Sequence, residues 1–154
     1  MTALVFDIEA NGLLDTATEI YVFVGKELNG ETIVQYSNIY NITKSILHTL
    51  TSYPILIGHN VIGYDIPLLS KLGKLDLEDF YSNHKVIDTL VLSRLLYPDR
   101  GGGHSIEAWA ERFKMQKVQN EVWDRYDPIM DERCLTDVQI TERVYNRLMW
   151  EKEQ

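Results

Sequence analysis

The sequence lacks several features that particular protein classes require. Its single cysteine, Cys134, cannot form a disulfide within the chain and lies in a helical pattern that favours a small buried side chain. No apolar run is long enough to cross a bilayer, so we expect a soluble protein with no membrane partner. The N-terminus shows no basic segment followed by an apolar stretch and a cleavage site, and we therefore expect a cytoplasmic protein.

Basic residues are also few. Lys and Arg number 15 against 23 Asp and Glu, which gives a formal net charge of −8. This balance disfavours binding of nucleic acid through a broad basic surface, because neutralising phosphates needs clustered Lys and Arg. A local phosphate-binding site is still compatible with this net charge, because carboxylates that hold two divalent ions present positive charge to one phosphodiester.

The sequence predicts a single α/β domain over residues 1–154. Alternating apolar residues come first, and helical patterns that alternate with short apolar runs follow. This order predicts a mixed central sheet, with three antiparallel strands and then parallel strands, and helices on both faces. Strands are expected at 5–9, 19–28, 31–38, 55–58 and 86–87, and helices at 42–50, around 68–72, at 88–95, at 104–113 and from 131 onward.

The first expected strand carries two carboxylates. In Val5-Phe6-Asp7-Ile8-Glu9, a period of two places Asp7 and Glu9 on one face and Phe6 and Ile8 on the other. Their Cβ atoms would lie about 6–7 Å apart at ~3.3 Å per residue, a spacing suited to two divalent cations. The alternative is a solvated strand face that is merely acidic.

Two further carboxylates are candidates. Asp65 precedes Ile-Pro-Leu-Leu, where it either joins a site or caps a helix whose first turn tolerates proline. Asp137 falls near the border of the apolar stripe of the last helix, where it either has a partner or is solvated.

The order of these motifs resembles the DEDD family of 3′–5′ exonucleases, and is most similar to the proofreading exonuclease domain of podophage family A DNA polymerases. The resemblance covers almost the whole chain. It rests on five segments that occur in the order typical of the family. They are Phe6-Asp7-Ile8-Glu9-Ala10-Asn11, His59-Asn60 with Tyr64-Asp65, residues 87–95 (Ile-Asp-Thr-Leu-Val-Leu-Ser-Arg-Leu), His104 with Glu107-Ala108-Trp109, and Asp137 in the last helix.

The resemblance implies a ribonuclease H-like fold and hydrolysis assisted by two metal ions. Asp7 would bridge both ions, Glu9 and Asp137 would bind the first, and Asp65 would contact the second. Mg2+ is the expected ion and Mn2+ a substitute, because the ligands are hard oxygens. The implied substrate is the 3′ end of single-stranded or frayed DNA, with Leu13 wedged against the terminal base and Asn60 near the strand.

The chain departs from the family at one catalytic position. Family members carry Tyr four residues, or His five residues, before the last Asp, where this sequence has Arg133 and Glu132. Arg cannot accept a proton, whereas Glu132 could act as a base but lies about 140° around the helix from Asp137. Arg133 either pairs with a site carboxylate or holds the substrate phosphate. His104 is a candidate base if the glycine-rich connection folds over the site; otherwise it packs against Trp109 or bonds to the main chain.

Two other functions stay open at this stage. A nucleic-acid-binding module with weakened catalysis would keep the fold and lose turnover, which Arg133 favours and the four carboxylates disfavour. An oligoribonuclease-like enzyme would keep the chemistry and act on RNA. A DNA polymerase is the implied partner, and a phage-encoded chain would act in the host cytoplasm.

Overall fold

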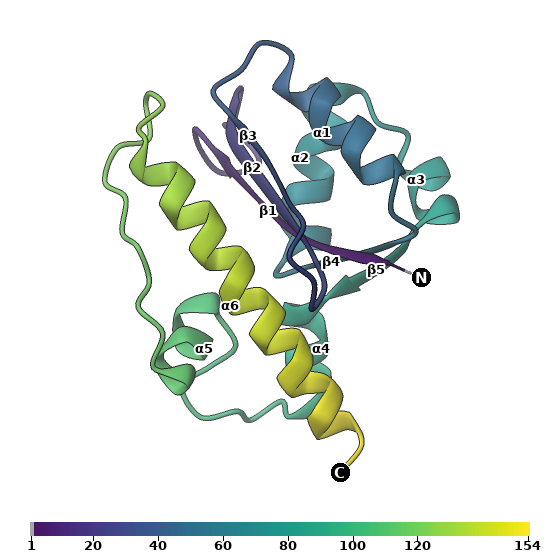
Figure 1. The fold of residues 1–154 in the computed structure, drawn as a ribbon, viewed down its shortest axis with the longest axis vertical. Coiled ribbons are helices and arrows are strands. Elements are labelled where there is room, and N and C mark those ends of the chain that lie inside the picture. Colours follow the sequence, from purple (N-terminus) through teal and green to yellow (C-terminus); the bar gives the residue numbers. More distant parts are fainter. Residues whose placement is uncertain (1) are drawn as a thin grey trace.

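The protein is built around a five-stranded mixed sheet with helices on both faces (Figure 1). The computed structural model describes residues 2–154. Strands β1 (Ala3–Ala10), β2 (Ile20–Glu27) and β3 (Ile33–Ser37) form an antiparallel meander, and β4 (Ile55–Gly58) and β5 (Lys85–Asp88) run parallel to β1. The strand order is β3-β2-β1-β4-β5. The predicted mixed sheet is confirmed.

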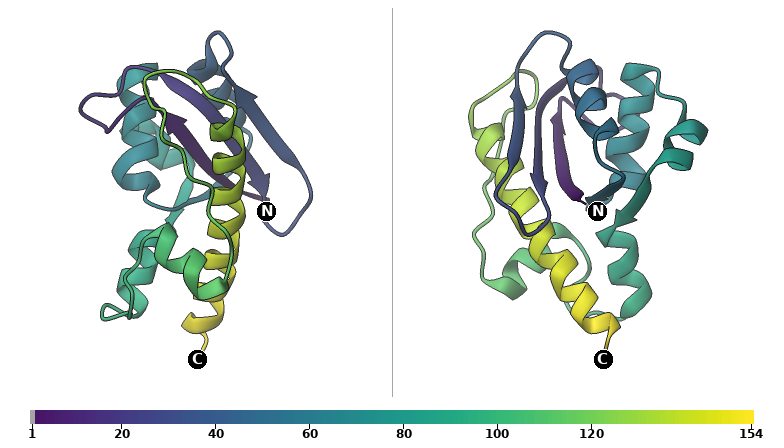
Figure 2. Two further views of the ribbon diagram at one scale, coloured as in Figure 1. Left: turned by 90° about the vertical axis from the view of Figure 1, so that its left-hand side faces the viewer. Right: turned by 45° about the vertical axis from the view of Figure 1, so that its right-hand side comes forward.

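Alternation along β1 separates the two sides of the protein. Leu4, Phe6 and Ile8 pack with α1 (Ile42–Thr51) and α2 (Ile66–Gly73) on one face. Ala3 and Val5 point to the opposite face, where α6 (Ile129–Lys152) crosses the sheet (Figure 2). Asp7 and Glu9 share the side of Val5 by the same alternation. The two carboxylates therefore face the long C-terminal helix.

The residue ranges of the remaining helices match the predicted ranges closely, with two differences. Helices α4 (Thr89–Leu96) and α5 (Ile106–Phe113) lie where they were predicted, whereas α3 (Leu77–Asn83) was not predicted. Only Phe80 of this seven-residue helix is buried. A single buried side chain gives no periodic apolar pattern from which the helix could be predicted. Helix α6 begins two residues before the predicted Asp131. Among residues 2–154, no helix combines the length and apolar character needed to cross a membrane.

Asp88 joins the end of β5 to two other segments. Its carboxylate is buried and, as the N-cap of α4, accepts a hydrogen bond from the Leu90 N–H at 2.9 Å. It also accepts the N–H groups of Asn60 and Ile62, both at 2.9 Å, from the π-helical turn Val61–Asp65 and its N-cap. One side chain thus satisfies main-chain donors from both connections at this edge of the sheet.

We predict that Asp88→Ala lowers the free energy of unfolding by about 2–4 kcal/mol, because a cap and buried N–H partners are lost together. Ser105→Ala is the matched control, since Ser105 caps α5 through a single bond to Ala108 and is exposed. That control should cost about 1 kcal/mol. Urea denaturation measures both, and equal losses would contradict the joining role of Asp88.

Candidate functional site

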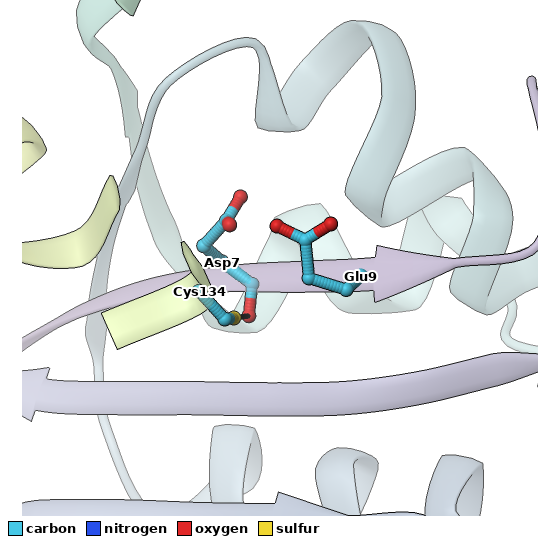
Figure 3. Close-up of side chains that lie close together, drawn as sticks. All are labelled: Asp7, Glu9 and Cys134. Carbon is cyan, nitrogen blue, oxygen red and sulfur yellow. Dashed lines mark hydrogen bonds between the residues drawn. The ribbon is translucent and has the colours of Figure 1, made fainter. Parts of the chain in front are cut away.

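Asp7 and Glu9 project together from β1, next to Cys134 of α6 (Figure 3). One carboxylate oxygen of Asp7, one of Glu9 and the Cys134 sulfur all lie within 4.8 Å of one another. The Cys134 thiol donates to the main-chain oxygen of Asp7 at 3.3 Å, and burial raises its pKa well above the usual value. Cys134 therefore fastens α6 to β1 as a protonated thiol, and the ligand set consists of carboxylates.

Asp65 reaches the same site from the start of α2. It is buried and makes no side-chain cap bond to that helix; instead it accepts the Ile8 N–H at 3.1 Å. This bond is available because the parallel pairing of β1 with β4 ends at Val5 and Ile57. The alternative role of Asp65 as a side-chain helix cap is wrong. The π-helical turn and the diverging strands direct its carboxylate toward β1.

Asp137 enters the site from α6 with a lysine that the sequence analysis missed. Lys117 Nζ lies 2.9 Å and 3.3 Å from the two carboxylate oxygens of Asp137, and 3.6 Å from Glu107. Its side chain is only 7% exposed. Nothing in the polar stretch before α6 distinguished Lys117, because its role depends on how residues 114–128 return to the sheet.

Arg133 pairs with a site carboxylate, which is one of its two predicted roles. Its Nε lies 3.3 Å from Glu9 Oε1, and its guanidinium lies over the Trp123 ring, 5.3 Å from the centroid. Glu132 is exposed on α6. The two positions that depart from the family pattern therefore place one cation beside Glu9 and one carboxylate in solvent.

The carboxylates share a strongly perturbed electrostatic environment. Burial, followed by the charges of Asp65, Asp137 and Glu9, raises the pKa of Asp7 well above its usual value. Burial likewise raises the pKa of Asp65 well above the usual value, and that of Glu9 to about 7 although Arg133 opposes it. The pKa of Asp137 is raised by burial against the effect of Lys117. Such groups ionise together only when cations lie among them.

These residues fit a divalent cation site. The four carboxylates offer hard oxygens, the donor type that Mg2+ and Mn2+ prefer. Among residues 2–154, no side chain or main-chain N–H donates a hydrogen bond to the Asp7 carboxylate, although it is mostly enclosed. Lys117 and Arg133 neutralise Asp137 and Glu9, and the Asp7 charge is left for a bound cation.

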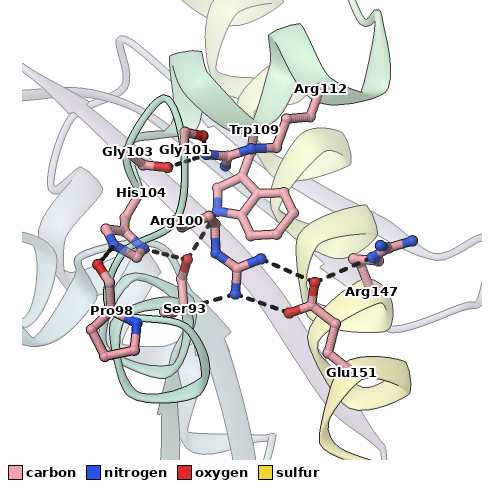
Figure 4. A network of polar contacts seen from close by, with 10 residues as sticks. All are labelled: Ser93, Pro98, Arg100, Gly101, Gly103, His104, Trp109, Arg112, Arg147 and Glu151. Carbon is pink, nitrogen blue, oxygen red and sulfur yellow. Dashed lines mark hydrogen bonds and ion pairs between the residues drawn. The ribbon is translucent and has the colours of Figure 1, made fainter. Parts of the chain in front are cut away.

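His104 lies at the edge of the site with both ring nitrogens engaged (Figure 4). Nε2 faces the Pro98 carbonyl at 3.1 Å, so it carries the proton, and Nδ1 accepts from the Ser93 hydroxyl at 2.8 Å. The neighbouring His59 bonds to Thr89 and to the His104 carbonyl, both at 2.8 Å, and burial lowers its pKa. In this arrangement neither imidazole is free to take a proton from a water beside Asp7.

The glycine-rich connection is tied to its neighbours by hydrogen bonds and an ion pair. Arg100 forms a bidentate ion pair with Glu151 of α6, with N–O distances of 3.0 Å and 2.9 Å (Figure 4). Arg112 of α5 donates to the carbonyls of Gly101 and Gly103. The connection thus holds His104 and the start of α5 in place.

Two open clefts meet at Asp7 and Asp137. The first, of about 620 Å³, is also lined by His59, Asn60 and Arg94. The second, of about 550 Å³, is lined by Glu9, Leu13, Tyr64, Trp123 and Arg133. The predicted substrate-contacting residues Asn60 and Leu13 therefore line different clefts. Both volumes are within the range of ligand sites.

Comparison with known proteins agrees with this geometry. A family model described as the RNase H superfamily matches residues 4–148. The DNA-directed DNA polymerase of Escherichia phage T7 is 28% identical over 151 residues, covering 84% of this chain. The match covers 21% of the polymerase, so the chain spans about a fifth of that relative's length.

Solved structures share the fold at low identity. NrnC of Brucella melitensis superposes with a TM-score of 0.69 at 22% identity, covering 98% of this chain and 74% of NrnC. Exonuclease X in complex with 5′ overhanging duplex DNA superposes with a TM-score of 0.62 at 15% identity, covering 99% and 93%. The RNase H-like fold and the predicted resemblance to DEDD-type proofreading exonucleases are confirmed, and the chain belongs to the RNase H superfamily.

Proposed function

We propose that this protein is a 3′–5′ exonuclease that hydrolyses the terminal phosphodiester of single-stranded or frayed DNA with the help of two divalent cations. The observation that carries the proposal is the group of four mutually repelling carboxylates, Asp7, Glu9, Asp65 and Asp137, of which Asp7 and Asp137 line both open clefts. A carboxylate cluster without cations is costly in a folded protein, and a polymer end lying across both clefts would place one phosphodiester against it.

The cations would be Mg2+ or Mn2+, held by Asp7 with Glu9 and Asp137, and by Asp7 with Asp65. When bound, they supply positive charge that activates water and stabilises the charge developing on the phosphate. The chain's own residues set the conditions for this step. Asp65 is fixed by the Ile8 N–H, and Cys134 fastens α6 to β1. The burial of Glu9, Asp65 and Asp137 limits the screening of their charges by water.

Proton transfer to a side chain would need a rearrangement at the site. Arg133 cannot accept a proton, and Glu132 is exposed. His104 would have to exchange its bonds to Ser93 and Pro98 for a water in the cleft. We therefore propose that the chain contributes mainly by holding charge and positioning the phosphate, and that His104 is the remaining candidate base.

Two alternative functions keep a specific basis. Lys117 and Arg133 already neutralise two carboxylates, which favours a nucleic-acid-binding module with weakened catalysis. The second alternative is an RNA substrate, because a carboxylate site with two divalent cations acts on the phosphodiester that DNA and RNA share. Because the relatives are polymerases of which this chain spans a fifth, we propose a DNA polymerase as the partner of a proofreading activity.

Parallel digestion of matched DNA and RNA strands, labelled at the 5′ end, distinguishes substrate and direction.

We predict that Asp7→Ala lowers the hydrolysis rate by more than about 100-fold, beyond the loss typical of a residue that only supports a ligand. The fold should survive, because the substitution removes repulsion among buried carboxylates. Glu132→Ala is the matched control, an exposed acidic residue on α6 that should retain wild-type activity. A 5′-labelled single strand incubated with Mn2+ gives the rate. Full activity of Asp7→Ala would show that the site is wrongly assigned.

The metal-free protein should lose stability between pH 6.5 and pH 8. The pKa of Glu9 is raised to about 7, and those of Asp7 and Asp65 are raised well above their usual values. The folded state therefore binds more protons than the unfolded state, and the free energy of unfolding falls as these protons leave. Half-buried His59, whose pKa is lowered by desolvation, acts in the opposite direction below this window.

Urea denaturation in a chelator at the two pH values measures this loss. Glu9→Gln should reduce it, and Mn2+ at pH 8 should restore stability because bound cations replace the protons. A metal-free protein that is more stable at pH 8 than at pH 6.5 would contradict the assignment.

We predict that Lys117→Met tightens Mn2+ binding by about 10-fold at pH 8, because the lysine competes with the cation for Asp137. Lys117→Arg keeps the positive charge and should bind Mn2+ with an affinity near that of the wild type. Titration calorimetry measures both without reference to activity. Weaker binding by Lys117→Met would show that Lys117 supports the cation site instead of competing with it.

A further inference from the structure

Glu107 is an acidic residue in a cleft that is proposed to receive a nucleic-acid strand. It lines the cleft of about 620 Å³ together with Asp7 and Asp137. Among the described residues that line this cleft, Glu107 is the one carboxylate outside the proposed ligand set. An unpaired negative charge at this place would repel the phosphates of a strand, so its charge needs a partner.

The partner is the ammonium of Lys117, which lies between two carboxylates. Lys117 Nζ lies 2.9 Å and 3.3 Å from the two oxygens of Asp137, and 3.6 Å from Oε1 of Glu107. The side chains of Lys117 and Asp137 are 7% and 11% exposed, whereas that of Glu107 is 59% exposed. Asp137 is thus the close, buried partner, and Glu107 is the more distant and more accessible one.

Asp137 cannot hold Lys117 and a divalent cation equally well. The two oxygens that the ammonium contacts are the same oxygens that the proposed cation site needs. A buried ammonium that loses its close partner carries a large free-energy cost, because water cannot solvate it there. The cation-bound state therefore needs another carboxylate within reach of Lys117.

Glu107 meets the requirements for this second partner. Its Oε1 is already within ion-pair distance of Lys117, and a shift of roughly 1 Å would give the ~2.8 Å of a charge-assisted hydrogen bond. Its side chain is largely exposed and free to move, whereas its main chain is held in the first turn of α5, which Ser105 caps. The movement needed is therefore confined to side chains.

We infer that Glu107 is a positioning residue that takes over the Lys117 ammonium when Asp137 binds a divalent cation. The inference rests on the proposed cation-dependent function and adds to it the residue that makes the Asp137 oxygens available. The same exchange neutralises Glu107 on the wall of the cleft. Asp137 is released for the cation, and the cleft becomes less repulsive to a polyanion in one step.

A purely structural role for Glu107 is the alternative. An acidic residue in the first turn of a helix is stabilised by the positive end of the helix dipole. In that role Glu107 would affect the stability of α5, and its effect on cation affinity would not depend on Lys117. The deciding observation is therefore the coupling between Glu107 and Lys117.

A double-mutant cycle in Mn2+ affinity, measured by titration calorimetry at pH 8, tests the exchange. Glu107→Gln should weaken Mn2+ binding by about 10-fold, because Lys117 then stays on Asp137. In the Lys117→Met background no ammonium needs a partner, and the same substitution should change the affinity by less than about 3-fold. Glu111→Gln is the matched control, an exposed glutamate one turn later on α5, and should bind Mn2+ as wild type does.

Equal or larger weakening by Glu107→Gln in the Lys117→Met background would overturn the inference, because Glu107 would then act on the cation directly. Unchanged affinity of Glu107→Gln in the wild-type background would overturn it as well. A crystal structure of the Mn2+-loaded protein should place Lys117 Nζ about 3 Å from Glu107 and farther from Asp137. Thermal denaturation in a chelator confirms that each variant is folded.

Failure of the proposed function is distinguishable from failure of the exchange. If wild type shows the expected coupling in Mn2+ binding but shortens neither DNA nor RNA, the exonuclease proposal fails and the exchange stands. If wild type shortens DNA and the cycle shows no coupling, the exchange alone fails. Wild type that binds no Mn2+ in calorimetry overturns the exchange, whatever its activity.

Discussion

Mutual repulsion among four carboxylates is the constraint on which the site and much of the fold depend. Asp7 and Glu9 are forced to the same side of β1 by strand alternation, and α6 and α2 bring Asp137 and Asp65 against them. The structure compensates this repulsion with cationic side chains and a main-chain hydrogen-bond donor placed beside the carboxylates. Lys117 meets Asp137, Arg133 meets Glu9, and the Ile8 N–H meets Asp65. Only Asp7, at the centre, has no such partner among the described residues.

The surrounding elements hold this charge at the edge of the sheet. Parallel pairing of β1 with β4 stops at Val5, so the last residues of β1 lie where neighbouring connections diverge. Asp88 ties the turn after β4 to the start of α4, and the Arg100–Glu151 ion pair ties the connection after α4 to α6. The site therefore lies between segments that are fixed to one another at several points, and two clefts give access to it.

Most of the fold could be predicted from the sequence because its signals are local. Alternation along β1 and β2, the Asp88 cap and the apolar spacing of α5 and α6 each appear within a few residues. What could not be predicted depends on contacts distant in sequence. Helix α3 buries only Phe80, Asp65 bonds to a strand 57 residues away, and Lys117 is one of many polar residues until residues 114–128 fold back. The motif order predicted four carboxylates that the structure brings together, but the cations among them had no sequence signature.

The hydrogen bond between the Ile8 amide and Asp65 has a spectroscopic consequence. An amide proton that is bonded to a carboxylate senses the charge on that carboxylate, so the Ile8 N–H connects the main chain of β1 to the electrostatic state of the site. Its chemical shift in a nuclear magnetic resonance spectrum would follow the protonation of Asp65 or the arrival of a cation beside it. Because this reporter belongs to the backbone, the occupancy of the site can be followed in the unaltered protein, without a label or a substitution among the carboxylates.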